Sequence, residues 1–207
     1  MTARPEYWLR AKRALARRDP VLAAIMRERP RVALQSRGDP FQTLARSIVG
    51  QQISVKAAQS VWNRLAGAVP AVAPDAVAAL RLRRLRACGL SARKSEYLRD
   101  LARHFVDGTI EVGRWPEMDD EAVIAELIRV RGIGRWTAEM LLMFSLLRPD
   151  VLPVDDLGLR RAASRHYFDG ADVGAAELRA FGARWEPWRS VATWYLWRSL
   201  EPVPVDY

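Results

Sequence analysis

Two segments of the chain combine residue types and spacing that could do chemistry, and the first is Gly132-Ile133-Gly134. It stands between an amphipathic segment and a nearly all-apolar one that begins directly with Arg135. Two glycines permit positive φ angles and leave no side chain between the backbone and a ligand, and the start of a helix offers unpaired amides and a positive dipole end. The turn therefore predicts a phosphate-binding site with Ile133 anchored in the core. A plain turn between two helices is the alternative.

The second segment is the acid pair Asp155-Asp156, which follows a stretch interrupted by Pro149 and Pro153. A helix over 135–147 carries the chain roughly 20 Å from the glycine turn, and about seven extended residues can return it by about 23 Å. A carboxylate here can therefore line the same cleft as the turn. If Asp155 is the N-cap of the next helix, Asp156 lies in the first turn, where the helix dipole favours an ionised carboxylate. The alternative is that both acids only cap a helix.

The composition favours a polyanionic partner and argues against several kinds of site. The 207 residues carry 33 Lys+Arg against 24 Asp+Glu, a formal net charge of +9. A basic surface gains from releasing counterions from phosphates, although a coding bias toward Ala and Arg is the alternative. The lone Cys88 excludes internal disulfides and clusters built from several cysteines, and with only His104 and His166 a histidine metal centre is not expected.

Neither a membrane span nor a secretory signal can be recognised in the sequence. The longest apolar run near a helix, Met140 to Leu147, is far shorter than the roughly 20 residues that a span requires. The residues after Met1 are charged and lack an apolar signal region. We therefore expect a soluble, cytoplasmic protein, associated with the nucleoid if the source is bacterial.

Helical rather than alternating periodicity dominates the chain, so an all-α fold is expected. Capping residues, prolines or acids mark helix starts at Asp39-Pro40, Ser54, Ala73-Pro74-Asp75, Ser91 and Asp119-Asp120-Glu121. The basic run Arg81–Arg86 is interpreted as a solvated face rather than a phosphate contact. The expected helices cover about 5–18, 20–28, 40–49, 54–67, 75–80, 91–107, 119–131, 135–147, 155–167, 175–183 and 187–200.

The interruption at 148–153 predicts a lobe boundary. One lobe, residues 41–147, would carry the glycine turn. Residues before about 40 are too few to fold alone, so they are expected to pack with the segment after 148. The second lobe, residues 1–40 plus 148–207, is therefore discontinuous and carries the acid pair.

Four ordered motifs stand in the chain: Phe41–Ala58, Gly89–Ala102, the glycine turn within Leu127–Ala138, and Trp185–Ser190. Together they resemble the helix-hairpin-helix (HhH-GPD) DNA glycosylase superfamily, in its 3-methyladenine DNA glycosylase II (AlkA-type) branch. This superfamily is named for the hairpin, a Gly/Pro-rich loop and a catalytic Asp. The resemblance implies an all-α fold of two helical lobes with a cleft between them, in a short form without the N-terminal β-rich domain of longer members.

The resemblance assigns the catalytic role to Asp156, because Trp136 and the Asp-Leu-Gly-Leu pattern align, and leaves Asp155 as the alternative in a shifted register. It implies that the carboxylate stabilises an oxocarbenium-like sugar. Superfamily members that also cut the strand have a lysine nucleophile at the position of Trp136. Without that amine no Schiff base forms, so the resemblance implies a monofunctional enzyme that leaves an abasic site.

The resemblance also implies a base pocket and a wedge loop. Indole faces attract a positively charged methylated purine once it has left the duplex, and the wedge fills the space that the base vacates. Gln52 stands at the wedge position. The implied pocket residues are Trp136, Met140 and Trp197, and the implied wedge loop is Gln51, Gln52 and Ile53.

The expected partner is double-stranded DNA with alkylated purines of the 3-methyladenine and 7-methylguanine class, bound by a monomer with no membrane partner. No cofactor is expected, and a monovalent cation at the hairpin carbonyls is left open. Two other functions remain open: a non-catalytic module that binds distorted DNA, and a glycosylase for oxidised or mismatched bases. Contacts to the DNA backbone are expected from Gly132, Ile133, Gly134, Arg135 and Thr137.

Overall fold

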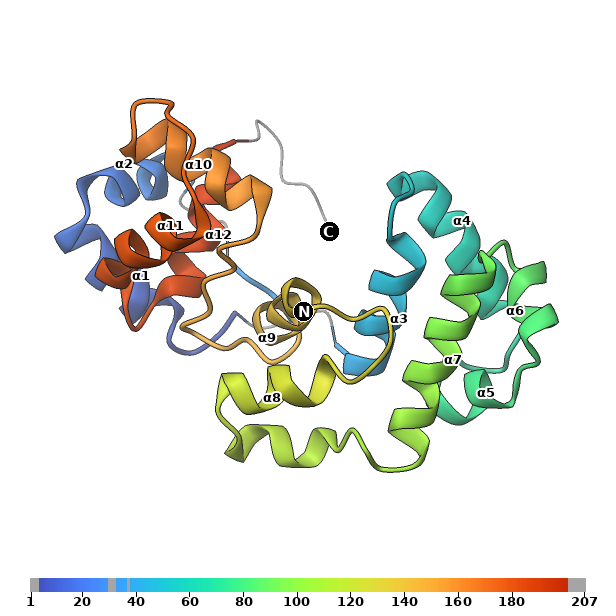
Figure 1. Cartoon of the computed structure of the whole chain (residues 1–207). Coiled ribbons are helices and arrows are strands. Elements are labelled where there is room, and N and C mark those ends of the chain that lie inside the picture. Colours follow the sequence, from blue (N-terminus) through green and yellow to red (C-terminus); the bar gives the residue numbers. More distant parts are fainter. Residues whose placement is uncertain (1–3, 30–32, 37, 201–207) are drawn as a thin grey trace. The chain divides into compact units, whose positions relative to one another are not determined.

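The computed structural model describes residues 4–29, 33–36 and 38–200, and every regular element in these ranges is helical (Figure 1). The all-α fold expected from the sequence is therefore confirmed. The chain forms two units, residues 37–141, called here the hairpin unit, and residues 1–36 with 142–207, called the discontinuous unit. The sequence had placed these breaks at 40/41 and 147/148. Parts of the expected lobes, at 1–3, 30–32, 37 and 201–207, lie outside the described residues.

The hairpin unit is organised around α7 (Ala92–Val106), which packs against α3, α5 and α6 (Figure 1). Leu98, Leu101 and Ala102 are the fully buried apolar residues of α7. The other elements are α3 (Pro40–Gly50), α4 (Val55–Ala66), α5 (Pro74–Ala79), α6 (Leu82–Ala87), η1 (Val112–Glu117), α8 (Asp120–Leu127) and the first residues of α9 (Arg135–Phe144). The long helix thus packs against three helices that precede it in the sequence.

Local capping explains where these helices start. Side chains of Asp39, Ser54, Ser91 and Asp119 accept hydrogen bonds from the amides three residues on, at 2.8, 3.3, 3.2 and 2.7 Å. These four predicted caps are confirmed. By contrast, α6 and η1 were not expected, and α8 ends at Leu127 because the next residues form the turn before α9.

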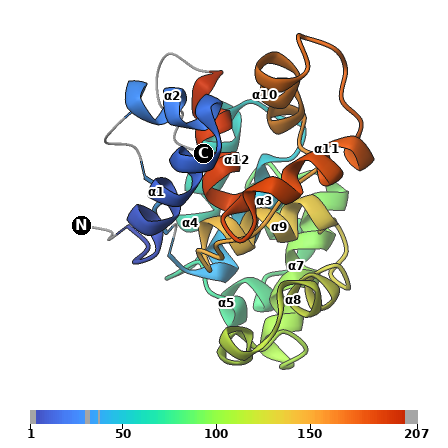
Figure 2. The same ribbon diagram turned by 90° about the vertical axis from the view of Figure 1, so that its left-hand side faces the viewer.

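The discontinuous unit is built around α12 (Arg189–Ser199), which packs against α1, α2 and α10 (Figures 1 and 2). The core face of α12 is formed by Val191, Ala192, Tyr195 and Leu196, all fully buried. The remaining elements are α1 (Trp8–Arg18), α2 (Pro20–Glu28), α10 (Leu157–Tyr167), α11 (Ala175–Gly182) and η2 (Ala183–Trp185). Among the residues that the structure describes, no helix is long and apolar enough to cross a membrane.

A buried carboxylate joins the start of α2 to two other elements of the discontinuous unit. Asp19 accepts hydrogen bonds from the Leu22 amide, the Tyr167 hydroxyl and the Trp185 indole N–H, at 3.0, 2.9 and 2.9 Å. Burying a charged group is costly unless it is hydrogen-bonded, and three donors offset that cost here. Asp19 therefore caps α2 and, through the same carboxylate, links α2 to α10 and η2.

Candidate functional site

The glycine turn between α8 and α9 uses its two glycines for different reasons. Gly132 has a φ of +87°, and a Cβ there would lie 2.1 Å from Cδ2 of Tyr97, so no larger residue fits. Gly134 does not have a positive φ, and a Cβ there would meet nothing within 4 Å. Ile133 is 5% exposed, which confirms that it anchors the turn in the core. The positive φ that the sequence allowed at both glycines is thus needed at Gly132 only.

Two side chains of helix α7 contact this turn. Asp100 accepts a hydrogen bond from the Arg131 amide at 2.9 Å, and the Tyr97 ring packs under Gly132. The first amides of α9 follow immediately, and first-turn amides of a helix have no partner within the helix. With Gly134 exposed and without a side chain, this helix start is accessible to an anion such as a phosphate.

Two side chains expected at the DNA backbone are engaged within the hairpin unit itself. The Arg135 guanidinium contacts both oxygens of Glu121 and hydrogen-bonds Glu139 at 3.1 Å. The hydrogen bonds that Arg135 donates to Glu121, together with the charges of both carboxylates, raise the pKa of Arg135. Thr137 is only 8% exposed. The groups that this turn leaves available for the predicted phosphate are therefore mainly its backbone amides, at the positive end of the helix dipole.

The three residues of the expected wedge loop have different environments. Gln51, at the end of α3, is half-buried, and its side-chain amide donates to the Gly132 carbonyl at 2.8 Å. Gln52 is exposed and has a φ of +57°, so it forms the tip of the loop. Ile53 is 41% exposed. The structure thus exposes Gln52 and ties Gln51 to the turn, and the wedge role of Gln52 stays a prediction.

Asp156 is the N-cap of α10. Its Oδ1 accepts a hydrogen bond from the Leu159 amide at 2.6 Å and from the Trp197 indole N–H at 2.7 Å. The sequence analysis considered the case in which Asp155 is the cap and Asp156 lies in the first turn, and the structure shows Asp156 at the cap instead. Asp155 is exposed, whereas Asp156 is partly buried. The indole, which lies 41 residues further along the chain, explains why the second acid takes the cap.

Trp197 is positioned by stacking as well as by this hydrogen bond. Its ring stacks on Phe144, with centroids 5.9 Å apart and planes inclined by 12°. Trp194 meets the same phenylalanine edge-on at 6.0 Å and lies under the Arg198 guanidinium at 4.3 Å. The indole that contacts Asp156 is therefore held in one orientation by an aromatic cluster.

Gly158 makes room for the contact between the indole and the carboxylate. A Cβ at this position would lie 3.1 Å from Oδ1 of Asp156 and 3.2 Å from Cδ1 of Trp197. Both distances are tighter than ordinary van der Waals contact, so either partner would have to move by a few tenths of an ångström. The absence of a side chain at Gly158 therefore helps to set the hydrogen bond length.

The three expected pocket residues do not fall in one unit. Trp136, 44% exposed, and Met140, half-buried, stand one helical turn apart on α9 in the hairpin unit. Trp197 belongs to the discontinuous unit. The structure brings Trp197 to Asp156, and a pocket shared by all three residues stays a prediction.

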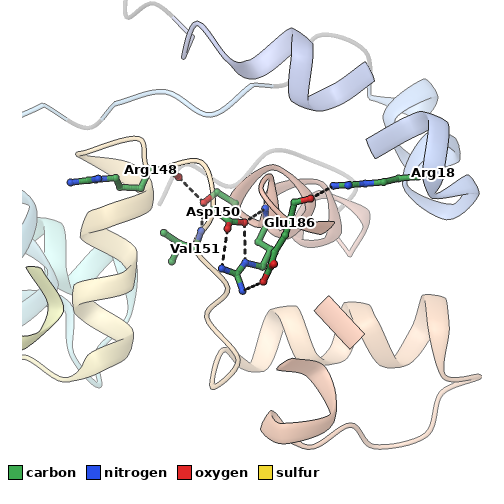
Figure 3. A network of polar contacts seen from close by, with 7 residues as sticks. Arg18, Arg148, Asp150, Val151 and Glu186 are labelled. Carbon is green, nitrogen blue, oxygen red and sulfur yellow. Dashed lines mark hydrogen bonds and ion pairs between the residues drawn. The ribbon is translucent and has the colours of Figure 1, made fainter. Parts of the chain in front are cut away.

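The segment that leads from α9 to Asp156 is fixed by a polar network (Figure 3). The Ser190 hydroxyl donates to the Arg148 carbonyl at 2.6 Å and accepts from the Val151 amide at 2.9 Å. Arg189 pairs with Asp150 through Nε at 2.9 Å and Nη2 at 3.0 Å. Ser190 is fully buried, so its hydroxyl pairs backbone groups of the irregular segment 148–151 that no helix pairs.

Outer contacts extend the network to neighbouring elements of the same unit. Nη1 of Arg189 pairs with Glu186 at 2.8 Å, and the Glu186 carbonyl accepts from Arg18 at 2.7 Å (Figure 3). The Trp185–Ser190 motif had been noticed in the sequence without a role for each residue. In the structure, Arg189 and Ser190 of this motif bond residues 148–151, in the segment that leads to Asp156.

The carbonyls of the turn already have hydrogen-bond donors. Those of Leu127, Val130 and Gly132 accept from the Val130 amide, the Ile133 amide and the Gln51 side chain at 3.1, 3.1 and 2.8 Å. No group of three or more His, Cys, Asp or Glu suited to a metal ion occurs in the described part of the chain. The monovalent cation left open by the sequence stays a prediction, and no chemical step is assigned to it.

Comparison with known proteins agrees with these features. The model of the "HhH-GPD superfamily base excision DNA repair protein" family matches residues 45–189. The Bacillus subtilis protein YfjP is 33% identical over 188 residues, which cover 87% of this chain and 66% of YfjP.

Two solved structures are similar in fold and sequence. A DNA-3-methyladenine glycosidase from Bacillus halodurans matches with a TM-score of 0.79 and 35% identity, over 89% of this chain and 90% of that one. The 3-methyladenine DNA glycosylase Mag1 of Schizosaccharomyces pombe, in complex with abasic DNA, matches with a TM-score of 0.78 and 30% identity, over 92% and 96%. These matches confirm the resemblance seen in the sequence: the chain belongs to the HhH-GPD superfamily of base excision DNA repair proteins.

Proposed function

We propose that the protein is a monofunctional DNA glycosylase that hydrolyses the N-glycosidic bond of alkylated purines such as 3-methyladenine and 7-methylguanine. The observation that carries the proposal is the carboxylate of Asp156, fixed by the Leu159 amide and the Trp197 indole. Names of relatives point to the same substrates, since the B. halodurans and S. pombe proteins are called 3-methyladenine enzymes.

The proposed reaction needs a negative charge beside the sugar. As the bond to the base lengthens, the sugar becomes oxocarbenium-like and positively charged. At 3.5 Å and an effective dielectric constant of 20, a carboxylate attracts a unit positive charge by about 5 kcal/mol. The hydrogen bonds from Leu159 and Trp197 hold Oδ1 of Asp156, so the carboxylate is preorganised for this electrostatic role.

Water is the proposed nucleophile. Strand cleavage by a lyase requires an amine that forms a Schiff base, and the position that would supply it is occupied by Trp136. The product is then DNA with an abasic site and a free base. The complex of Mag1 with abasic DNA shows that relative bound to such a product.

Recognition of the base would combine charge and shape. A purine methylated on a ring nitrogen carries positive charge, which indole faces attract, and the same charge makes it a good leaving group. Trp136 on α9 and Trp197 on α12 are the proposed contacts, with Met140 beside Trp136. Extrusion of the base from the stack precedes the reaction, and the exposed tip at Gln52 is proposed to fill the vacated space.

The proposed partner is double-stranded DNA, bound by a single copy of the chain without a membrane. The backbone is bound at the glycine turn, and the surplus of 33 basic over 24 acidic residues adds a salt-dependent attraction. In cells we expect the protein to act in the cytoplasm, on chromosomal DNA.

The test measures release of free bases from methylated duplex DNA, with a panel of duplexes that each carry one defined lesion. We expect the wild type to release 3-methyladenine or 7-methylguanine and Asp156→Asn to be slower by about a thousandfold, since Asn keeps the size and loses the charge. Asp155→Asn is the matched control and retains activity. Binding without release would favour a non-catalytic module, and release of only oxidised or mispaired bases would reject the proposed substrate.

A further inference from the structure

One face of α7 contacts both the end of α3 and the glycine turn. Lys94, Tyr97 and Asp100 follow one another at intervals of three residues, which places them along one side of the helix. The Lys94 ammonium donates to the Val49 carbonyl at 2.8 Å, and the other two side chains hold Gly132 and the Arg131 amide. The end of α3 and the glycine turn, far apart in sequence, therefore contact the same helix.

Gln51 links these two loops directly. Its side-chain amide donates to the Gly132 carbonyl across 81 residues of sequence, at 2.8 Å and in a half-buried place. The next residue, Gln52, is exposed and has a positive φ. A residue with its side chain turned inward thus stands beside one that forms the tip of the loop, which indicates different roles for two identical side chains.

We infer that Gln51 is a positioning residue that couples the wedge tip at Gln52 to the phosphate-binding turn at Gly132. The inference rests on the proposed function, because it assigns the tip to base extrusion. Lys94 and Tyr97 of α7 contact Val49 and Gly132, and Gln51 is hydrogen-bonded to Gly132, so the residues on the α3 side of the tip are joined to the turn. Once the turn has bound a phosphate, the tip at Gln52 already lies at a fixed distance from that phosphate.

The physical gain is a smaller loss of loop freedom when the tip enters the stack. A preorganised loop has less conformational entropy to lose on binding, so more of the contact energy is left to offset unstacking. The gain matters most for a lesion that is still paired and stacked, because extrusion of an unpaired base costs less. Loss of the link should therefore slow reaction of paired lesions and affect unpaired ones little.

The test compares Gln51→Met with the matched control Gln59→Met, in the full chain. Methionine has a similar length and no donor. Gln59 lies exposed on α4 and bonds Asn63 on the surface of the same helix, at 2.7 Å. The assay is single-turnover release of a methylated purine from two duplexes, one with the lesion paired and one with it opposite an abasic analogue. We expect Gln51→Met to be about tenfold slower on the paired lesion and within about twofold of wild type on the other, and Gln59→Met to match wild type on both.

A second measurement separates coupling from simple loss of structure. If Gln51 acts through the tip, adding Gln51→Met to Gln52→Ala should slow the paired reaction by less than about twofold more. Equal slowing on both duplexes, no slowing on the paired one, or fully additive effects in the double variant would overturn the inference. If Gln51→Met does not fold, Gln51→Glu is used instead, with Gln59→Glu as its charge control. A wild type that releases no base from either duplex overturns the proposed function, whereas an active wild type with an unaffected Gln51 variant overturns the coupling alone.

Discussion

The glycine turn of the hairpin unit and the acid of the discontinuous unit both lie at a helix start, that of α9 and that of α10, and they use it in opposite ways. At α9 the turn offers backbone amides to an external anion, with Gly134 leaving open space above them. At α10 the helix start is occupied by the protein's own anion, Asp156. The start of α9 suits the binding of an external anion. The start of α10 suits the fixing of a carboxylate beside the sugar in the proposed reaction.

The supports of the two helix starts differ in kind. The turn is held by fit, because the Tyr97 ring fills the space where Gly132 lacks a side chain. The acid is held by hydrogen bonds, directly from Trp197 and indirectly through the Ser190 network at 148–151. Substitutions should therefore act by steric strain in the first region and by orphaned polar groups in the second.

The largest expected effect on stability is at Gly132. Alanine there combines an unfavourable positive φ with overlap of its Cβ on Tyr97, so we expect Gly132→Ala to lower the free energy of unfolding by about 3 kcal/mol. Gly134→Ala is the matched control: its Cβ meets open space, and the change in stability should stay within about 0.5 kcal/mol. Urea denaturation measures both.

DNA affinity gives the second half of this test. Gly134→Ala places a methyl group where a phosphate would approach, so binding to duplex DNA should weaken several-fold while the fold is unaffected. A Gly132→Ala variant as stable as wild type would contradict the steric account. Unchanged DNA affinity in Gly134→Ala would show that the phosphate binds elsewhere.

Sequence reasoning succeeded where the cause was local. The caps at Asp39, Ser54, Ser91 and Asp119 were predicted because a cap bonds an amide three residues away. The six-residue helix α6 was missed, since one and a half turns give too few positions to show a period. The turn was found for its glycines, and its support by Tyr97, 35 residues earlier, left no local signal.

The choice between the two acids shows the same limit more sharply. Asp155 and Asp156 have the same side chain and adjacent positions, so local propensity favours neither as the cap. The indole of Trp197, far along the chain, decides the matter in favour of Asp156. Alignment of motifs had identified Asp156 as the catalytic candidate, but its place at the cap required the tertiary contact.

The next largest effect is expected in the network of the discontinuous unit. Ser190→Ala leaves the Val151 amide and the Arg148 carbonyl without their buried partner, so the free energy of unfolding should fall by about 2 kcal/mol. Thr193, on the same helix, is equally buried, and its hydroxyl has no hydrogen-bond partner among the described residues. Thr193→Val should therefore change stability by less than about 0.5 kcal/mol, and thermal denaturation of the two variants compares them. Equal losses would mean that packing rather than hydrogen bonding fixes this loop.

A smaller effect, on rate, is expected at the indole itself. Trp197→Phe keeps an aromatic ring against Phe144 and removes the N–H that holds Asp156, so single-turnover release should slow by about tenfold. The same change at Trp194, whose indole N–H bonds nothing in the described residues, removes no such contact and should slow release by less than about threefold. If both variants slow release equally, the hydrogen bond is not what positions the carboxylate.

The smallest effect is expected at Gly158 in the discontinuous unit. As at Gly132 in the glycine turn, the missing side chain there makes room for a neighbouring ring. Alanine favours the helical conformation over glycine by about 1 kcal/mol, so Gly158→Ala gains in helix propensity what it loses in contact with Asp156 and Trp197. Stability should then stay within about 1 kcal/mol of wild type, while release slows about threefold because the indole is displaced from the carboxylate. Combining Gly158→Ala with Trp197→Phe tests this reason: once the N–H is gone, the extra methyl group should cost almost nothing further. A full additional threefold loss in the double variant would show that the methyl group disturbs the carboxylate or its surroundings directly, and that Gly158 does not act through the indole.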